Sequence, residues 1–309
     1  MDVPKEKLYE RGGLIMFDEY KYYKENEKIK RVSVKTDDTP PDPRYDYDGH
    51  IGKMMCWHRD YTLGDYKENK FADNEDFLND LVRENIKDNT LINYVKNKKT
   101  SNGLELRYDR HEKMWQLWGT YYLFPLMSSR DAKFGIIEEY EDITWLVDDI
   151  IEALPQEDKW KLLEKHAQII FMPLFLYDHS GITMNTCGYS CRWDSGQVGY
   201  IYTDRKTILD LNAYYRNEKG KSTKVTKNNW KKAAYLWMEG EVEEYDQYLT
   251  GEVYGIIEEE YDVEDDTWEE TDSCWGFFNS KFGGELIEDV ARDYGISETL
   301  YDSMEEIVS

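Results

Sequence analysis

The sequence lacks the features that mark a membrane span or a secreted scaffold. No run approaches the about 18 consecutive apolar residues of a transmembrane helix, and the first residues, MDVPKEKLYERGG, contain no apolar signal-peptide segment. Four cysteines in 309 residues do not make a disulfide scaffold. We therefore expect a cytoplasmic protein with buried, reduced thiols and no membrane contact.

Positive charge is also scarce. Lys and Arg number 39 against 64 Asp and Glu, which gives a formal net charge of −25. Such a charge repels nucleic-acid phosphates, so we expect no direct binding of nucleic acid. The aromatic content of 15% far exceeds that of disordered acidic chains and indicates a folded protein.

Motifs for nucleotide chemistry are missing as well. The chain contains no G-x-x-x-x-G-K-[ST] loop, no G-x-G-x-x-G loop and no H-E-x-x-H pair. The segment GYSCR (188–192) lacks the last glycine of a G-x-S-x-G nucleophile elbow. These absences predict a protein without a cofactor.

Hydrophobic periodicity predicts strands toward both ends of the chain and helices between them. Residues 17–28 are expected to form a loose helix or an extended lead-in, and strands are predicted at 30–35, 52–58, 169–177, 182–184, 199–202, 252–261 and 268–278. Helices are predicted at 74–84, 90–98, 141–153, from Pro155 onward, at 204–215 and at 228–248.

This order of elements predicts an α+β fold. We expect a mostly antiparallel sheet with packed helices and a helical middle insertion. Residues 1–28 would be a lead-in or extension, 29–280 the core domain with the insertion at about 87–166, and 281–309 a C-terminal helical tail.

Negative charge is concentrated in two segments that contain no Lys or Arg. Residues 239–272 hold 16 acidic side chains, and residues 138–158 hold nine. A surface stabilised by salt bridges would instead intersperse the two signs. The carboxylates that we predict to bind a partner are Glu138, Glu139, Glu141, Asp142, Glu239, Glu243, Glu244, Asp246, Glu258, Glu259, Glu260, Asp262, Glu264, Asp265 and Asp266.

The spacing of these carboxylates is compatible with imitation of a nucleic acid. Duplex DNA carries one charge per roughly 3.4 Å along each strand. Carboxylates at i and i+2 on a strand, or at i and i+4 on a helix, lie about 6–7 Å apart, or twice that repeat. The alternatives are a solvated acidic face and loops that bind divalent ions.

A second candidate site is the segment around His179. His179 would act as a general base for Cys187 or Cys191, with Asp194 orienting the imidazole. The alternative is a tight turn at 178–181, in which Asp178 and Ser180 bond to the backbone.

Soft ligands and aromatic residues give two further hypotheses. Cys56, His58, His179, Cys187 and Cys191 include enough ligands for zinc, but their spacing does not fit zinc motifs, so no metal is predicted. Five aromatic residues could form a platform on which bases stack, but we expect them to belong to the hydrophobic core, together with Cys274. They are Trp57, Trp193, Trp275, Phe277 and Phe278.

Four blocks of the chain resemble one protein family. They are DYDGHIGKMMCWHRDYTLGD (46–65), PLFLYDHSGITMNTCGYSCRWDSGQVGYIY (173–202), EVEEYDQYLTGEVYGIIEEE (241–260) and DSCWGFF (272–278). The family consists of uncharacterised acidic proteins carried by phages and integrative mobile elements of Gram-positive bacteria. Its members are shorter, so the resemblance implies additions near 100–165 and after 280. It implies no catalytic residue, although accessory genes of such elements often counter host defences.

Charge and resemblance together predict a non-enzymatic inhibitor of a host nucleic-acid-binding or defence protein. Its carboxylates would stand in for phosphates in a basic groove of that partner. Two alternatives stay open. One is a hydrolase or nuclease that uses His179, Cys187 and Asp194 or a carboxylate-bound metal. The other is a structural or assembly protein of a mobile element, and the oligomeric state is equally open.

Overall fold

The computed structural model describes residues 20–25, 28–66, 68, 70–122, 132–217 and 219–278. It confirms an α+β fold, and every strand pairing among these residues is antiparallel. Of the expected lead-in at 1–28, residues 1–19 lie outside the described residues, and residues 20–25 are extended, not helical, and belong to a sheet as strand β1 (Tyr20–Glu25). The expected helical tail at 281–309 also lies outside the described residues. The described helices include none that is both long and apolar enough to cross a membrane.

A four-stranded sheet forms the centre of the molecule. Its strand order is β3-β9-β7-β8, with bounds Lys53–Cys56, Ser195–Asp204, Ile169–Asp178 and Ile182–Asn185. These strands confirm the predictions made from the apolar runs. Pro173 pairs with Tyr200 inside β7, one residue before a register shift at Leu174/Phe175, so the irregular ladder accommodates the missing N–H of proline.

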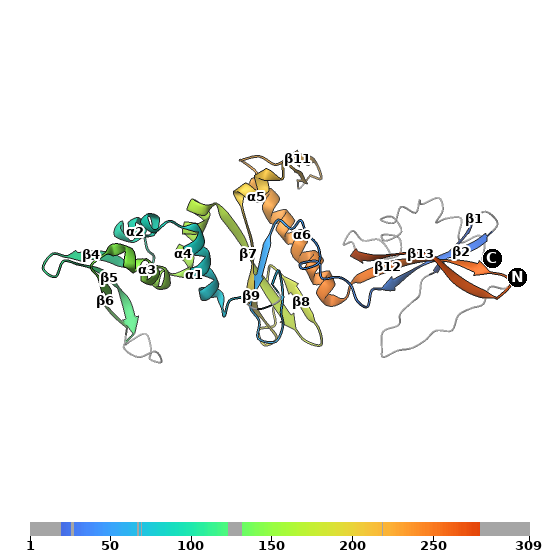
Figure 1. The fold of residues 1–309 in the computed structure, drawn as a ribbon, viewed down its shortest axis with the longest axis horizontal. Coiled ribbons are helices and arrows are strands. Elements are labelled where there is room, and N and C mark those ends of the chain that lie inside the picture. The colour runs from blue at the N-terminus through green and yellow to red at the C-terminus, as the bar shows by residue number, and fades with distance from the viewer. Residues whose placement is uncertain are drawn as a thin grey trace.

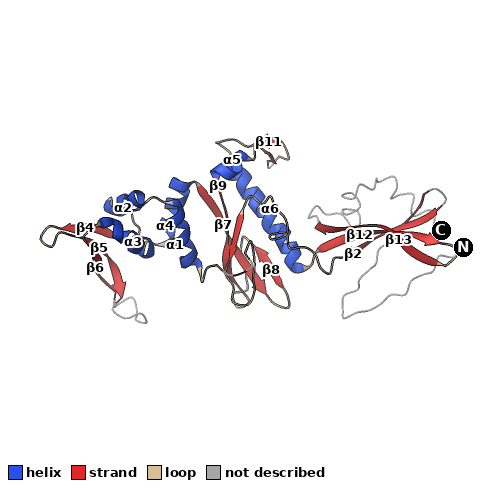
Figure 2. Cartoon of the chain, in the orientation of Figure 1, coloured by secondary structure: helices blue, strands red, loops and turns tan. Residues whose placement is uncertain are grey.

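Helices cover both faces of the central sheet. Met55, Ile169 and Tyr200 point to one face, where they join a core with α1 (Asn74–Asn85) and α4 (Gln156–Leu162). Met54 and Ile201, their neighbours along the strands, point to the other face and pack against α6 (Trp230–Thr250). This alternation follows from the period of two in a strand. Figure 2 shows the sheet with helices on either side.

Helix α1 illustrates why the local predictions succeed. Asp73 accepts hydrogen bonds from the backbone N–H groups of Glu75 and Asp76 over 2.9 and 3.0 Å, which caps the helix. The apolar residues at helical spacing are all buried: Phe77, Leu78, Leu81 and Val82. The prediction of a helix at 74–84 is therefore confirmed.

The middle segment is only partly helical. It contains α2 (Asp88–Lys96), a 3₁₀ turn (Ile143–Leu146), α3 (Val147–Ala153) and α4, as the periodicity predicted. It also contains a sheet that was not predicted, in the order β4-β5-β6, with bounds Glu105–Asp109, Met114–Tyr122 and Ala132–Tyr140. Leu104, Leu117 and Ile137 connect this sheet to the helices.

The second four-stranded sheet joins the two ends of the chain. Its order is β1-β2-β12-β13, with bounds Tyr20–Glu25, Lys28–Thr36, Val253–Asp262 and Thr267–Phe278. We call this sheet the arm. Helix α6 ends at Gly251, whose φ of 78° is easily adopted by glycine, and the chain enters β12 two residues later. In Figure 1 the arm and the β4-β5-β6 sheet lie at opposite ends of an elongated molecule.

Several predictions made from the sequence are corrected. The helix expected at 204–215 ends early, as α5 (Arg205–Asp210), because Asn212 has a φ of 48° and β10 (Tyr214–Arg216) then pairs with β11 (Ser222–Lys224). Of the four thiols only Cys56 is buried, while Cys274 and Cys187 are exposed. Cys274 therefore lies outside the core that its aromatic neighbours had indicated.

Candidate functional site

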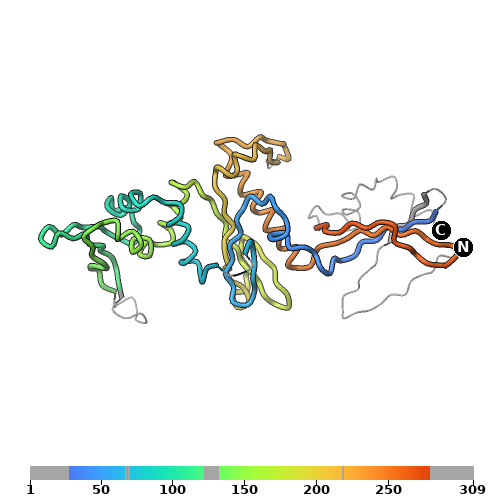
Figure 3. The backbone as a smooth tube through the Cα atoms, in the orientation of Figure 1, coloured from blue at the N-terminus to red at the C-terminus, as the bar shows by residue number. Residues whose placement is uncertain are grey.

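The carboxylates of β12 are paired with basic side chains of β2. Glu258 Oε1 lies 2.9 Å from Lys30 Nζ, and Glu260 Oε1 lies 2.6 Å from Lys28 Nζ. These pairs connect residues more than two hundred positions apart, because β2 and β12 run side by side in the arm (Figure 3). The predicted row of free negative charge along β12 is thus neutralised within the molecule.

Glu259 takes part in a more enclosed ion pair. Its carboxylate accepts hydrogen bonds from Nε and Nη2 of Arg31 over 2.7 and 3.1 Å, and both side chains are largely buried. The Arg31 guanidinium also lies 4.4 Å from the centre of the Trp268 ring. An arginine that binds a carboxylate through two hydrogen bonds and stacks on an aromatic ring links neighbouring strands, so we assign Glu259 a structural role.

Exposed carboxylates lie instead at the β12–β13 turn and on β13, the edge strand of the arm. Asp262 accepts from the backbone N–H groups of Glu264 and Asp265 over 2.7 and 3.3 Å, and Asp266 accepts from the Tyr261 hydroxyl. These contacts fix the turn while its carboxylates face solvent. We define the arm tip as Glu264, Asp265, Asp266, Glu269 and Glu270, all of which are exposed.

Of the predicted acidic residues of α6, one is bonded to the central sheet and three are exposed. Asp246 accepts from Thr183 Oγ1 and from the Met184 N–H, both over 2.7 Å, and so fastens α6 to β8. Glu239, Glu243 and Glu244 are exposed, although partial burial raises the pKa of Glu244. Part of this predicted group therefore stabilises the fold.

Sequence reasoning missed a carboxylate in the same helix. Glu241 accepts from Arg44 Nη1 over 2.9 Å and from the Ile51 N–H over 2.7 Å. A single acidic residue in an acidic helix gives no signal of such a role. Only the three-dimensional structure shows that Glu241 pairs with the buried side chain of Arg44.

The second acidic segment lies far from the arm. Glu138 and Glu141 are exposed, while Glu139 accepts from Gln116 Nε2 over 2.7 Å. Asp142 caps the 3₁₀ turn by accepting from the Thr144 N–H over 2.9 Å, and this hydrogen bond lowers the pKa of its carboxyl. Because β6 and the arm lie at opposite ends of the molecule (Figure 1), the two acidic segments do not form one track.

The loop around His179 brings together only part of the predicted site. Asp194 Oδ2 lies 3.6 Å from His179 Nδ1 and 3.5 Å from Cys191 Sγ. Cys187 lies instead beside Thr186. His179 is mostly exposed, and its backbone N–H donates to the Gly181 carbonyl oxygen over 3.0 Å. A tight turn is thus present at 178–181, with Ser180 at a φ of 61°, but the Asp178 carboxylate accepts from the Tyr61 hydroxyl over 3.0 Å and not from the backbone as that alternative had it.

The candidate zinc ligands are not assembled around a common point. Burial raises the pKa of the Cys56 thiol, and Cys56 packs in the core on the α6 side of the sheet. His58 Nδ1 accepts from the Asp60 N–H over 3.1 Å, and its ring stacks on Tyr61. Within the ranges that the structure describes, no group of three or more His, Cys, Asp or Glu side chains is arranged to hold a metal ion.

The aromatic set also separates into buried and exposed members. Trp57 packs against Phe77 and Tyr200 in the core, as expected. Trp193 is 96% exposed on the loop before β9, and Trp275 is 46% exposed on the edge strand. The expectation of core is wrong for these two residues.

No protein-family model, curated protein or solved structure matches the chain. An assignment of function therefore depends on the geometry and charge of the molecule itself.

Proposed function

We propose that this protein is a non-enzymatic acidic inhibitor that binds a basic groove of a host nucleic-acid-binding defence protein through its arm tip. The observation that carries the proposal is the run of 16 acidic residues without a basic one in 239–272. Five exposed members of this run gather at the arm tip, away from the body of the protein. In such a complex the carboxylates occupy the places of phosphates.

The arm supports this role through the placement of its charge. Pairs between β2 and β12 neutralise the inner strands, and the charge that stays exposed is on the outer strand and turn. A rigid element that presents carboxylates loses little conformational entropy on binding. Carboxylates that meet Lys and Arg side chains form charge-assisted hydrogen bonds, which are stronger than neutral ones.

The setting of the proposal is an accessory gene of a phage or integrative element. The partner is then a host enzyme or sensor that grips DNA or RNA with lysines and arginines. Binding by charge complementarity predicts fast association that weakens steeply with added salt. It also predicts that the inhibited partner no longer binds nucleic acid.

A pull-down from host lysate with matched variants tests the proposal. The arm-tip variant is Glu264→Gln/Glu269→Gln/Glu270→Gln, and the control is Glu138→Gln/Glu141→Gln/Glu152→Gln. Both remove three exposed carboxylates, at opposite ends of the molecule. We expect the native chain and the control to retain one nucleic-acid-binding protein that high salt releases, and the arm-tip variant to lose it. Equal recovery by all three chains would overturn the proposal.

The triple substitution of Glu258, Glu259 and Glu260 is a poor test. Each of these carboxylates has a basic partner within the arm, so their removal changes the stability of the sheet as well as its charge. The arm-tip variant avoids this, because no ion pair of its three residues occurs among the described residues.

A further inference from the structure

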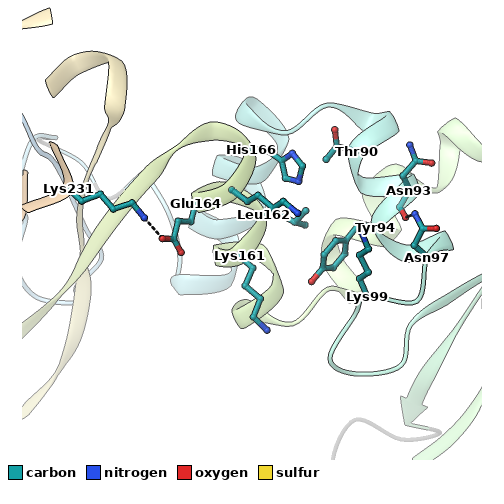
Figure 4. A pocket seen from close by; sticks show the side chains of 11 residues that line it. Thr90, Asn93, Tyr94, Asn97, Lys99, Lys161, Leu162, Glu164, His166 and Lys231 are labelled. Carbon is teal, nitrogen blue, oxygen red and sulfur yellow. Dashed lines mark hydrogen bonds and ion pairs between the residues drawn. The ribbon is translucent and has the colours of Figure 1, made fainter. Parts of the chain in front are cut away.

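A groove lined by cationic side chains lies between α2, the end of α4 and the start of α6. Its volume is about 780 Å³, within the about 300–1,000 Å³ typical of small-molecule sites. Figure 4 shows the lining side chains, which come from three separate segments of the chain. The lysines among them are Lys99, Lys161, Lys165 and Lys231, joined by His166.

The charge of this groove opposes that of the protein. One carboxylate, Glu164, lines it beside four lysines, although the chain as a whole carries −25. Glu164 Oε1 lies 2.5 Å from Lys231 Nζ, and Lys161 Nζ lies 2.5 Å from Glu157 Oε1. Lys99 and Lys165 have no ion-pair partner among the described residues. The groove therefore holds at least two positive charges that nothing described here neutralises.

A π-helical turn shapes one wall of the groove. Residues Leu163–Ala167 form this turn directly after α4, and Gln168 ends it in the left-handed conformation with a φ of 56°. Turns of this kind are rare and are found frequently at functional sites, because they change the direction of the side chains they carry. Here the turn carries Glu164, Lys165 and His166, which line the groove.

The opposite wall is the exposed face of α2. Thr90, Asn93 and Asn97 share this face by helical spacing and offer hydroxyl and amide groups. Tyr94 stays protonated there, because burial and its hydrogen bond to Asp158 raise its pKa to about 12. The α2 wall thus offers neutral groups, and Glu164 on the other wall is the acidic residue among the side chains that line the groove.

Asp158, which lies behind this wall, is fully buried. Its oxygens accept hydrogen bonds from Tyr94, from the Ser101 N–H and from the Ser101 hydroxyl over 3.0, 2.6 and 3.0 Å. These donors hold its negative charge inside the protein, although Lys161 Nζ approaches it to 3.6 Å. The groove surface itself stays cationic.

We propose that this groove binds a small phosphorylated ligand that carries at least two phosphoryl groups. Lys99 and Lys165 would pair with the phosphoryl oxygens, and the amides of α2 would hydrogen-bond to the rest of the ligand. Small size follows from the volume of the groove and from the charge of the chain, because a long polyanion would be repelled by the surrounding acidic surface. This site is independent of the arm tip and does not depend on the function proposed for it.

Calorimetric titration with inorganic pyrophosphate at low salt tests the proposal. The groove variant is Lys99→Gln/Lys165→Gln, and the control is Lys206→Gln/Lys227→Gln. The control removes the same charge from exposed positions outside the groove. We expect the native chain and the control to bind pyrophosphate, and the groove variant to bind it at least about tenfold more weakly, since each lost charge-assisted hydrogen bond counts for about that factor.

Three results would overturn the proposal. The first is that the native chain does not bind pyrophosphate. The second is that the groove variant and the control weaken binding equally, which would indicate a general effect of charge. The third is that the groove variant binds as tightly as the native chain. Circular dichroism of both variants checks that they remain folded.

Discussion

Arg44 joins three segments of the central body, and its loss is expected to destabilise the fold. Its guanidinium donates to Asp65 Oδ1 over 2.8 Å, to Glu241 Oε2 over 2.9 Å and to the Gly52 carbonyl oxygen over 2.7 Å. The side chain is only 1% exposed. One arginine thereby connects the loop before β3, the loop after it and α6.

The magnitude follows from what Arg44→Met leaves behind. Removal of one partner from a buried ion pair costs about 3–5 kcal/mol. Both carboxylates keep a backbone donor, since Met54 N–H donates to Asp65 and Ile51 N–H donates to Glu241, and both are partly exposed. These contacts place the expected loss near the lower limit, at about 3 kcal/mol out of a total stability of about 5–15 kcal/mol.

Urea unfolding followed by tryptophan fluorescence measures this loss. Arg44→Lys keeps the charge without the planar fork and should lose less, about 1–2 kcal/mol. Arg59→Met is the control, because Arg59 is a highly exposed arginine that pairs with its neighbour Asp60. A loss for Arg44→Met no greater than for Arg59→Met would show that the buried contacts of Arg44 do not stabilise the fold.

Three further predictions concern single side chains. Glu259→Gln leaves Arg31 buried without its counter-charge and should lower the free energy of unfolding, measured in urea, by about 3 kcal/mol. Glu269→Gln changes an exposed residue and should leave that free energy unchanged, and equal urea midpoints for the two variants would contradict this. Burial lowers the pKa of Lys159, which is 2% exposed, below its usual value of 10.5. Between these two pKa values the unfolded chain binds more protons than the folded chain, so the free energy of unfolding rises as the pH approaches 10.5. Lys159→Met should lose that rise, whatever it loses with the hydrogen bond from Lys159 Nζ to Asn79 Oδ1, and a rise of unchanged size would count against this. His179→Ala should leave partner recovery unchanged, because its ring lies in an exposed turn, and lost recovery would place His179 in the partner interface instead.

The periodicity of apolar residues was sufficient to predict the strands of the central sheet and most of the helices. The runs in β7 and β9 are apolar because both faces of that sheet are covered, and a capped, amphipathic α1 follows from Asp73 and its apolar spacing. Within the β4-β5-β6 sheet only β4 (ELRYD, 105–109) has few apolar residues. The aromatic residues of β5 (MWQLWGTYY, 114–122) are typical of a strand, so this sheet was predictable in part and was missed because the surrounding helical periodicity was extended over it.

The candidate site was less accessible from the sequence because its properties depend on tertiary partners. Glu258 and Lys30 are separated by 228 positions, so their pairing required the arrangement of the arm. The cationic groove likewise combines lysines from three segments, none of which is basic enough alone to attract notice. Trp193 was assigned to the core from its residue type, and only the loop geometry shows that it is exposed.

A competition experiment with the captured partner tests whether the arm tip takes the place of nucleic acid. A labelled duplex or single strand is bound to the partner recovered by the pull-down, its fluorescence anisotropy is recorded, and the native chain is then added. We expect the native chain to release the nucleic acid and the Glu264→Gln/Glu269→Gln/Glu270→Gln variant to leave it bound. Nucleic acid that stays bound while the native chain also binds the partner would contradict the account.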